Sequence, residues 1–206
     1  MLMTPNEHGS PHCRLLSLVA TTSLFLLVVC PRSEAQCAHL RAGSRPAVAD
    51  SIGLVAAKGT PNGLLEGAVE SWRTCRQYGR DFPRFVVGAT GTRTVEVEYV
   101  HGSSGARSCG SFQRRKIKLF GSALDPSGRP RRCGDPATIL AHELGHVLGL
   151  VDQYGSGSCS SHIMSQTPPA GRDRRRVEPA ECATVAARWA MEADRLASVD
   201  DGAERP

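Results

Sequence analysis

The sequence predicts an α+β fold, and three observations support this class. Segments of strand length with apolar or alternating patterns occur at residues 51–57, 82–89, 94–100 and 117–120. An apolar stripe at helical spacing lies between the first two of these segments. After the last of them the chain carries start signals for two more helices. With 206 residues, the chain is long enough for one domain once a targeting segment is removed.

The first helix is expected to begin at Thr60-Pro61, because threonine is a common cap and proline suits the first helical position. Its apolar stripe consists of Leu64, Leu65, Ala68, Val69, Trp72 and Cys75. Trp72 on this stripe is interpreted as a core residue and not as part of a ligand site. Gly79 is expected to end the helix.

The middle of the chain predicts strands that are joined by loops. Phe85-Val86-Val87 is typical of a buried strand, and residues 94–100 alternate with the period of a strand that has one wet face. Residues 102–110 are expected to form a flexible connection before a strand at Ile117–Phe120. Residues 125–135 are rich in Pro, Gly and Arg, and we expect a loop there.

Two helices are expected in the second half of the chain. Asp135-Pro136 supplies a cap and a first helical residue. The buried side of this helix would consist of Leu140, Leu144, Val147, Leu148 and Val151. Glu178-Pro179 opens the last helix, and the tail after Ser198 is expected to be loose. The apolar contacts of the last helix would come from Val185, Ala186, Trp189, Met191, Ala193 and Leu196.

The helix that begins at Asp135-Pro136 contains the motif H-E-x-x-H-x-x-G-x-x-D. His142 and His146 are four residues apart and lie on one helix face, where both imidazoles can bind one metal ion. Glu143 can reach a metal-bound water without binding the metal. Gly149 can adopt the left-handed conformation that ends the helix, so that Asp152 returns as a third ligand. Three protein ligands leave one position for water, which predicts a catalytic Zn²⁺ site.

Alternatives remain open at these positions. The motif can also be an amphipathic helix with two incidental histidines, or a zinc site that does no chemistry. His162 could compete as a ligand, although a structural or exposed role is favoured because Asp152 already satisfies the pattern. Tyr154 could orient a ligand or donate to the oxyanion, or it could simply pack within its loop.

The motif and its surroundings resemble the metzincin metalloproteases. Residues 161–165 would be the turn that places a methionine, here Met164, as an apolar floor below the zinc. Asp152 in place of a third histidine is similar to the snapalysin group of small secreted bacterial neutral proteases, as are Tyr154 and the Gly/Ser-rich run up to Cys159. The resemblance covers residues 135–190 and is weaker upstream.

The resemblance implies a fold, a substrate strand and a disulfide. The fold would be a metzincin-like zincin fold, with a small twisted mixed sheet, two helices above the zinc cleft and a C-terminal helix below it. An edge strand within residues 106–112 would hold an extended substrate by backbone pairing. The pattern also suggests a disulfide between Cys159 and Cys182, which flank the Met164 loop.

The function that the resemblance implies is that of a secreted, monomeric zinc endopeptidase acting on proteins or peptides. Zinc lowers the pKa of bound water, and Glu143 takes the proton and passes it to the leaving amine. The alternative is a zinc-binding but catalytically silent adhesion or inhibitor module of the same fold. A serine or cysteine hydrolase is not supported, because the chain has no nucleophile-elbow signature.

The start of the chain predicts export. Residues 15–29 form an apolar run that suits the core of a signal peptide and is short for a membrane span. Cleavage after Ala35 would give a signal peptide at 1–35 and a single metalloprotease domain at 36–206. A lipid anchor at Cys30 is disfavoured by the bulky residue before it, and no stable membrane insertion is expected after signal removal.

The remaining cysteines are even in number, which suits disulfides in an oxidising compartment. Besides Cys159–Cys182, we expect Cys109 to pair with Cys133, which leaves Cys37 for Cys75. The residues around Cys133 superficially resemble the cysteine switch of matrix metalloproteases, but Cys133 directly precedes the helix, so a disulfide is expected instead. The net charge of +5 comes with basic clusters that lack aromatics, and nucleic-acid binding is not expected.

Overall fold

The computed structural model describes residue 38 and residues 51–79, 82–88, 93–103, 105–154, 158–166 and 175–203. All of these residues belong to one compact unit, Glu34–Pro206. The predicted signal peptide at 1–35 and the alternative anchor at Cys30 lie outside the described residues, and so does Cys37.

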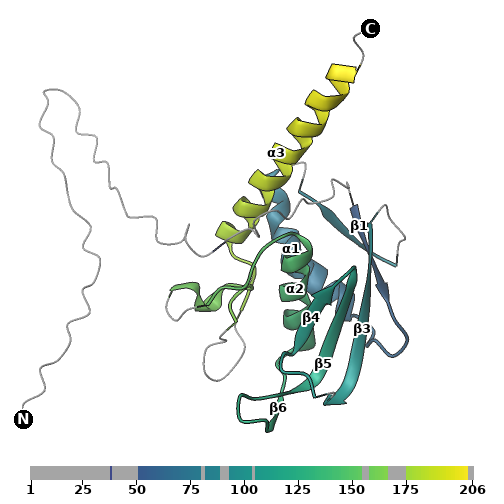
Figure 1. The fold of residues 1–206 in the computed structure, drawn as a ribbon, viewed down its shortest axis with the longest axis vertical. Helices are drawn as coiled ribbons and strands as arrows, with labels where there is room; N and C mark the ends of the chain where they lie inside the picture. The colour runs from purple at the N-terminus through teal and green to yellow at the C-terminus, as the bar shows by residue number, and fades with distance from the viewer. Residues whose placement is uncertain are drawn as a thin grey trace, which may run out of the picture. The chain divides into compact units, whose positions relative to one another are not determined.

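The sheet has six strands of mixed direction (Figure 1). They are β1 (Ser51–Ala56), β2 (Arg84–Val87), β3 (Arg93–Ser103), β4 (Gly110–Gln113), β5 (Lys116–Leu124) and β6 (Pro130–Arg132). Their order is β2-β1-β3-β5-β4, and β6 pairs with β5. The pairs among β2, β1, β3 and β5 are parallel, whereas β4 and β6 run antiparallel to β5. The predicted α+β class and the mixed sheet are confirmed.

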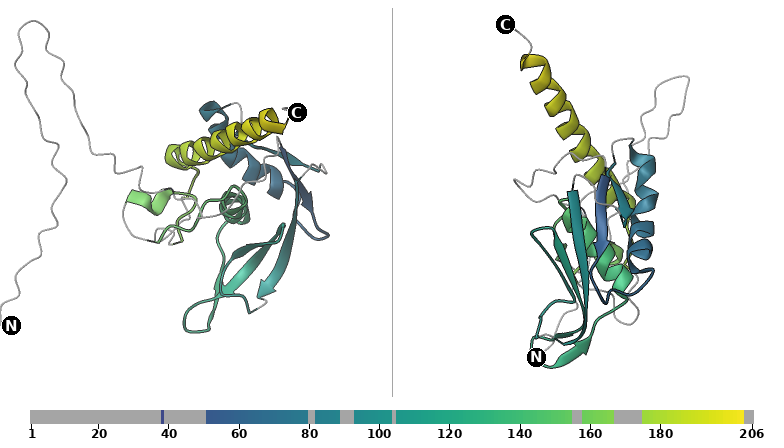
Figure 2. Two further views of the ribbon diagram at one scale, coloured as in Figure 1. Left: turned by 45° about the horizontal axis from the view of Figure 1, so that its top comes forward. Right: turned by 90° about the vertical axis from the view of Figure 1, so that its right-hand side faces the viewer.

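Three α-helices and two short 3₁₀ helices complete the described fold. They are α1 (Leu64–Arg73), η2 (Thr74–Tyr78), α2 (Pro136–Val147), η3 (Ser158–Ser161) and α3 (Pro179–Ala203). α1 contacts α2, and α2 in turn contacts β4 and β5. Figure 2 shows α1 and α2 together on one face of the sheet.

The core lies between the sheet and these two helices. Alternate strand residues face it, and those that are completely buried are Ile52, Leu54, Val95, Val97, Ile117, Leu119 and Ala123. The other face of the sheet carries charges: Lys116 Nζ lies 3.0 Å from Glu96 Oε1 and 2.8 Å from Glu98 Oε2. The alternation predicted for residues 94–100 therefore separates the core from a solvated face.

The start of the first helix was wrongly predicted. The cap is Gly63, with φ of +75°, and the helix begins at Leu64 instead of Pro61. The Thr60 hydroxyl, which was expected to cap the helix, donates instead to the carbonyl oxygen of Val97 at 3.0 Å. The predicted apolar stripe from Leu64 to Cys75 is confirmed, since it lies within the core cluster.

Three smaller expectations also need correction. The predicted loop at 125–135 contains β6, whose Pro-Arg-Arg sequence has no apolar alternation and is paired through the backbone to β5. Met191 does not contribute to the core, because 61% of its surface is exposed. The tail beyond Ser198 is not loose throughout, since α3 continues to Ala203.

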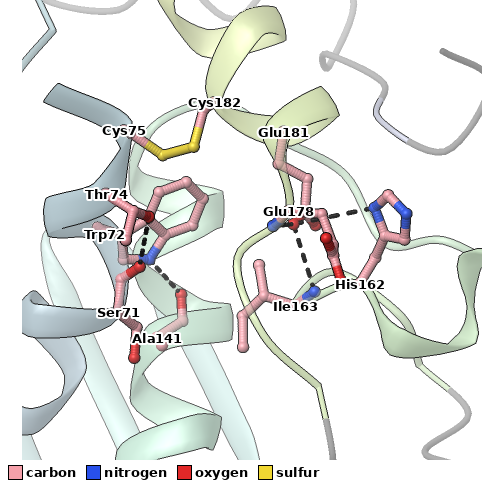
Figure 3. Close-up of a disulfide and its surroundings, with 10 residues drawn as sticks. All are labelled: Ser71, Trp72, Thr74, Cys75, Ala141, His162, Ile163, Glu178, Glu181 and Cys182. Atoms are coloured by element: carbon pink, nitrogen blue, oxygen red, sulfur yellow. Dashed lines mark hydrogen bonds and ion pairs between the residues drawn. A yellow bond between two sulfur atoms is a disulfide. The ribbon is translucent and has the colours of Figure 1, made fainter. Parts of the chain in front are cut away.

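Within the described residues, the structure gives the partners of two disulfides. Cys109–Cys133 is confirmed. The pairs Cys159–Cys182 and Cys37–Cys75 are wrong, because Cys75 in η2 bonds to Cys182 in the first turn of α3 (Figure 3). Their Cα atoms lie 4.9 Å apart although the residues are separated by 107 positions, a proximity that chain order could not indicate. Cys159 is disulfide-bonded as well.

Candidate metal centre

α2 begins as its sequence predicts. Asp135 precedes the helix, and its Oδ2 accepts hydrogen bonds from Thr138 N and Thr138 Oγ1, both at 2.9 Å. Pro136 occupies the first helical position, where its missing N–H costs nothing. The helix then carries His142 and Glu143 as buried residues against β4 and β5.

α2 ends in a turn that sends the chain back towards its own histidines. Gly149 has φ of +95°, in the left-handed region. Gly149 N donates to His146 O at 3.0 Å, and Leu150 N donates to Gly145 O at 2.9 Å. This pair of bonds is a Schellman motif, and glycine is the residue that adopts it without steric cost. The predicted role of Gly149 in ending the helix is confirmed, and the reversal brings Asp152 back beside α2.

His142, His146 and Asp152 converge. One ligand atom from each lies within 4.8 Å of the others. Asp152 Oδ1 lies 3.1 Å from His142 Nε2 and 3.4 Å from His146 Nε2. The two rings meet edge to face, at 87° with centroids 4.9 Å apart. This group can hold a metal ion.

The backbone determines which ring nitrogens face the centre of the group. His142 Nδ1 lies 2.8 Å from Ile163 O, and His146 Nδ1 lies 2.9 Å from Leu150 O. A carbonyl oxygen only accepts hydrogen bonds, so each Nδ1 must carry the proton. In the neutral rings both Nε2 atoms then present lone pairs towards Asp152. Such a backbone bond behind a histidine is typical of a metal ligand.

Three electron-pair donors at this separation need a positive charge between them. Burial raises the pKa of Asp152, but hydrogen bonds and positive charge from His142 and His146, when these rings are protonated, outweigh burial and lower it well below its usual value. For His146, burial lowers the pKa, yet Asp152 and the Leu150 carbonyl raise it overall. A tetrahedral Zn²⁺ with bonds of about 2.0–2.1 Å keeps its ligand atoms roughly 3.3 Å apart. The two measured N···O separations fit that spacing.

Glu143 lies beside the three ligands and is 4% exposed. Burial raises the pKa of its carboxyl, while His142 and His146 lower it in part. The side chain packs against Gly110 of β4: a Cβ atom at Gly110 would lie 2.5 Å from Glu143 Oε1 and 2.9 Å from Ile139 Cγ2. Glycine at this position therefore allows the strand to approach the carboxylate.

β4 lies at the edge of the sheet, and within the described residues it pairs only with β5. Phe120 N donates to Cys109 O at 2.9 Å, so the polar groups of the next residue, Gly110, point away from β5. Gly110 O accepts from the Ser108 hydroxyl at 2.7 Å. The strand overlaps only the end of the predicted range 106–112, and its outer edge, which pairs with no other described strand, lies next to Glu143.

Met164 is completely buried. A Cβ at Gly145 of α2 would overlap the Met164 sulfur and would lie 3.3 Å from Trp72 Cζ2. The return loop also bonds to this turn, through Gln153 N to Met164 O at 2.9 Å. The methionine therefore packs against the helix turn between the two histidines.

Two further residues were considered as neighbours of the site. Tyr154 follows the return loop but is 79% exposed, so it is not packed within its loop. His162 is buried, and its Nδ1 lies 3.9 Å from Glu181 Oε2. It is not a member of the His142–His146–Asp152 group, which agrees with the structural role that was favoured for it.

Sequence reasoning missed Gly110, Gly145 and Glu181. Glu181 is completely buried near the start of α3 and accepts hydrogen bonds from the turn that contains Met164. A signal was present: Glu181 follows Glu178-Pro179 at the helix position where a glutamate commonly bonds back to the cap. No local signal marks the two glycines, because their neighbours come from distant segments.

The described disulfides are typical of an extracytoplasmic or otherwise oxidising environment. In the part of the chain that was searched, no helix combines the length and apolar character needed to cross a membrane. Comparison with known proteins found no matching family model and no matching curated protein.

Proposed function

We propose that the chain is a secreted zinc-dependent endopeptidase with a metzincin-like fold, resembling the snapalysin group. The observation that carries this proposal is the convergence of three lone-pair donors, the two Nε2 atoms and Asp152 Oδ1, beside the carboxylate of Glu143. Zinc is favoured because imidazole and carboxylate at tetrahedral spacing are its usual ligands.

The residues of the chain would divide the work as follows. His142, His146 and Asp152 hold the ion, which when bound acidifies a water and polarises the scissile carbonyl. Glu143 would take the proton of that water and deliver it to the leaving amine. The unpaired edge of β4 orients an extended peptide alongside Glu143 by backbone hydrogen bonds.

One observation favours a second function. Glu143 is nearly enclosed, at 4% exposure, by β4 and α2. A zinc-binding but catalytically silent adhesion or inhibitor module of the same fold would tolerate such enclosure. Two of the three proposed ligands are more open, since 23% of the His146 and Asp152 side chains is exposed, and a peptide could approach from that side.

The test compares wild type with Glu143→Gln, each expressed from the full sequence into an oxidising compartment. We expect about one zinc per chain in both proteins, casein hydrolysis by wild type that chelator abolishes, and loss of hydrolysis in the variant. Glu66→Gln, an exposed glutamate of α1, is the matched control and should keep full activity. Zinc binding with equal inertness of wild type and Glu143→Gln would establish the silent module. Absence of zinc from wild type would overturn both functions.

A further inference from the structure

Glu181 is a buried carboxylate whose hydrogen bonds lead towards the proposed metal site. Its exposure is 0%. Oε1 accepts from Met164 N at 2.9 Å, and Oε2 accepts from Glu178 N at 2.9 Å and from Ile163 N at 3.4 Å. Figure 3 shows the side chain reaching from α3 to the backbone at Ile163. A helix cap needs only the bond from Glu178 N, so the two bonds to the Met164 turn require another explanation.

The peptide group between Ile163 and Met164 links Glu181 to a candidate ligand. Its N–H donates to Glu181 Oε1, and its carbonyl oxygen accepts from His142 Nδ1 at 2.8 Å. A peptide group is planar and resonance-stabilised. A negative charge at its N–H favours the resonance form that places more negative charge on its carbonyl oxygen. That oxygen then accepts more strongly from His142, which makes His142 Nε2 a better electron-pair donor.

We infer that Glu181 is a positioning residue for the metal ligand His142 and acts on it through the Ile163–Met164 peptide. The inference rests on the proposed metal site. The carboxylate orients the carbonyl that holds the imidazole ring and increases the basicity of that ring. The neighbouring residue, Cys182, is bonded to Cys75, and this disulfide ties the start of α3 to η2 (Figure 3). The carboxylate is thereby held on two elements instead of one.

His146 provides an internal comparison. Its Nδ1 bonds to Leu150 O, which belongs to the peptide with Val151. Within the described part of the chain, no carboxylate accepts a hydrogen bond from Val151 N. The two histidines should therefore differ, with the Nδ1 proton of His142 in the stronger hydrogen bond.

The first experiment measures zinc affinity by competition with a chromophoric chelator. Glu181→Gln keeps the shape of the side chain but loses its charge, and we expect the zinc dissociation constant to rise about 10- to 100-fold, the range for loss of a residue that supports a ligand. The absorption bands of the cobalt-substituted protein should shift as well. Glu181→Asp should recover part of the affinity. Glu178→Gln, a neighbouring carboxylate that bonds to Arg176, is the control and should leave affinity unchanged.

The outcomes separate this inference from the proposed function. If wild type binds no zinc, both are overturned. If wild type binds zinc and Glu181→Gln lowers only the melting temperature, with affinity and cobalt spectrum unchanged, Glu181 is merely structural and the inference alone fails. Should Glu181→Gln not fold, the proton spectrum of zinc-loaded wild type decides. We expect the His142 Nδ1 proton downfield of the His146 Nδ1 proton, and equal or reversed positions would overturn the inference.

Discussion

At the scale of single residues, Gly110 determines where Glu143 can lie. A Cβ at position 110 would come within 2.5 Å of Glu143 Oε1, and the backbone of β4 carries it there. The strand cannot easily shift to relieve this contact, since the same Cβ would also lie 2.9 Å from Ile139 Cγ2. Glu143, the proposed general base, can therefore occupy its position because residue 110 has no side chain.

Gly110→Ala should displace Glu143 while leaving the metal ligands in place. We expect kcat/KM for peptide hydrolysis to fall on the order of 100-fold, the cost of moving a catalytic group by about 1 Å. Zinc content should stay unchanged. Gly79→Ala is the control, because Gly79 has extended backbone and no heavy atom near its Cβ position. Full activity of Gly110→Ala would contradict the assignment of Glu143 as the base.

Residues with local roles could be predicted from the sequence, and residues with distant partners could not. Asp135 caps α2 and Gly149 ends it through bonds that reach at most a few positions along the chain. The spacing of the motif likewise fixes which histidines share a helix face. Gly110 and Gly145 are needed because Glu143 and Met164 arrive from other segments. The sequence around a glycine in a strand or helix does not indicate that a distant side chain packs against it.

At the scale of elements, Glu181 in the first turn of α3 accepts backbone hydrogen bonds from the Met164 turn. Burial raises the pKa of Glu181 to about 7, and its backbone hydrogen bonds lower it only in part. His162 lies 3.9 Å from the carboxyl, and the charge of Glu178 also raises the pKa of that carboxyl. In the folded protein the group therefore becomes the charged carboxylate that acts on His142 only above about pH 7, whereas in the unfolded chain it loses the proton near pH 4.5.

The sign of the resulting pH dependence follows from proton binding. Between about pH 4.5 and 7 the folded state holds more protons at Glu181 than the unfolded state, so this group makes the free energy of unfolding fall as pH rises. Below this window the contribution is constant. We expect denaturant titrations of wild type and Glu181→Gln to diverge across the window, with wild type losing more stability. Parallel curves would show that Glu181 does not change its protonation there.

The two described disulfides should serve different parts of the site. Cys75–Cys182 fixes the start of α3 next to Glu181, whereas Cys109–Cys133 joins the residue before β4 to the segment before α2. Replacing both cysteines of either pair with alanine should cost about 2–5 kcal/mol in the free energy of unfolding. Loss of Cys75–Cys182 should in addition weaken zinc binding. Loss of Cys109–Cys133 should lower kcat/KM instead, because β4 carries Gly110. Identical effects of the two replacements on affinity and turnover would contradict this division.

Element boundaries were predictable only where the signal is local. α2 begins at the predicted cap, but α1 begins at Leu64 because Gly63 adopts a left-handed conformation and the Thr60 hydroxyl bonds to β3. β6 has no apolar pattern, and it forms because its backbone pairs with β5. Cys75–Cys182 depends on how α3 returns to η2, which no spacing in the sequence indicates.

At the scale of the whole molecule, the proposed metal site is where separate segments of the chain meet. α2 supplies two candidate ligands, the return loop supplies Asp152, and the Met164 turn supports His142 through Ile163 O. α3 supports that turn through Glu181, and α1 holds α2 through Trp72 Nε1, which donates to Ala141 O at 2.9 Å. A bound ion would therefore stabilise contacts between segments far apart in the sequence.

Zinc should consequently stabilise the whole fold. With free zinc at about 100 times its dissociation constant, the gain is about 2.7 kcal/mol, which for a domain of this size raises the melting temperature by roughly 5–10 °C. The disulfide-bonded cysteines cannot bind zinc in the unfolded chain, so they do not reduce the stabilisation that zinc gives the folded state. Calorimetry with and without chelator measures the shift. His146→Ala should abolish it, and His101→Ala, on the exposed part of β3, should retain it. A shift that survives His146→Ala would place the ion elsewhere.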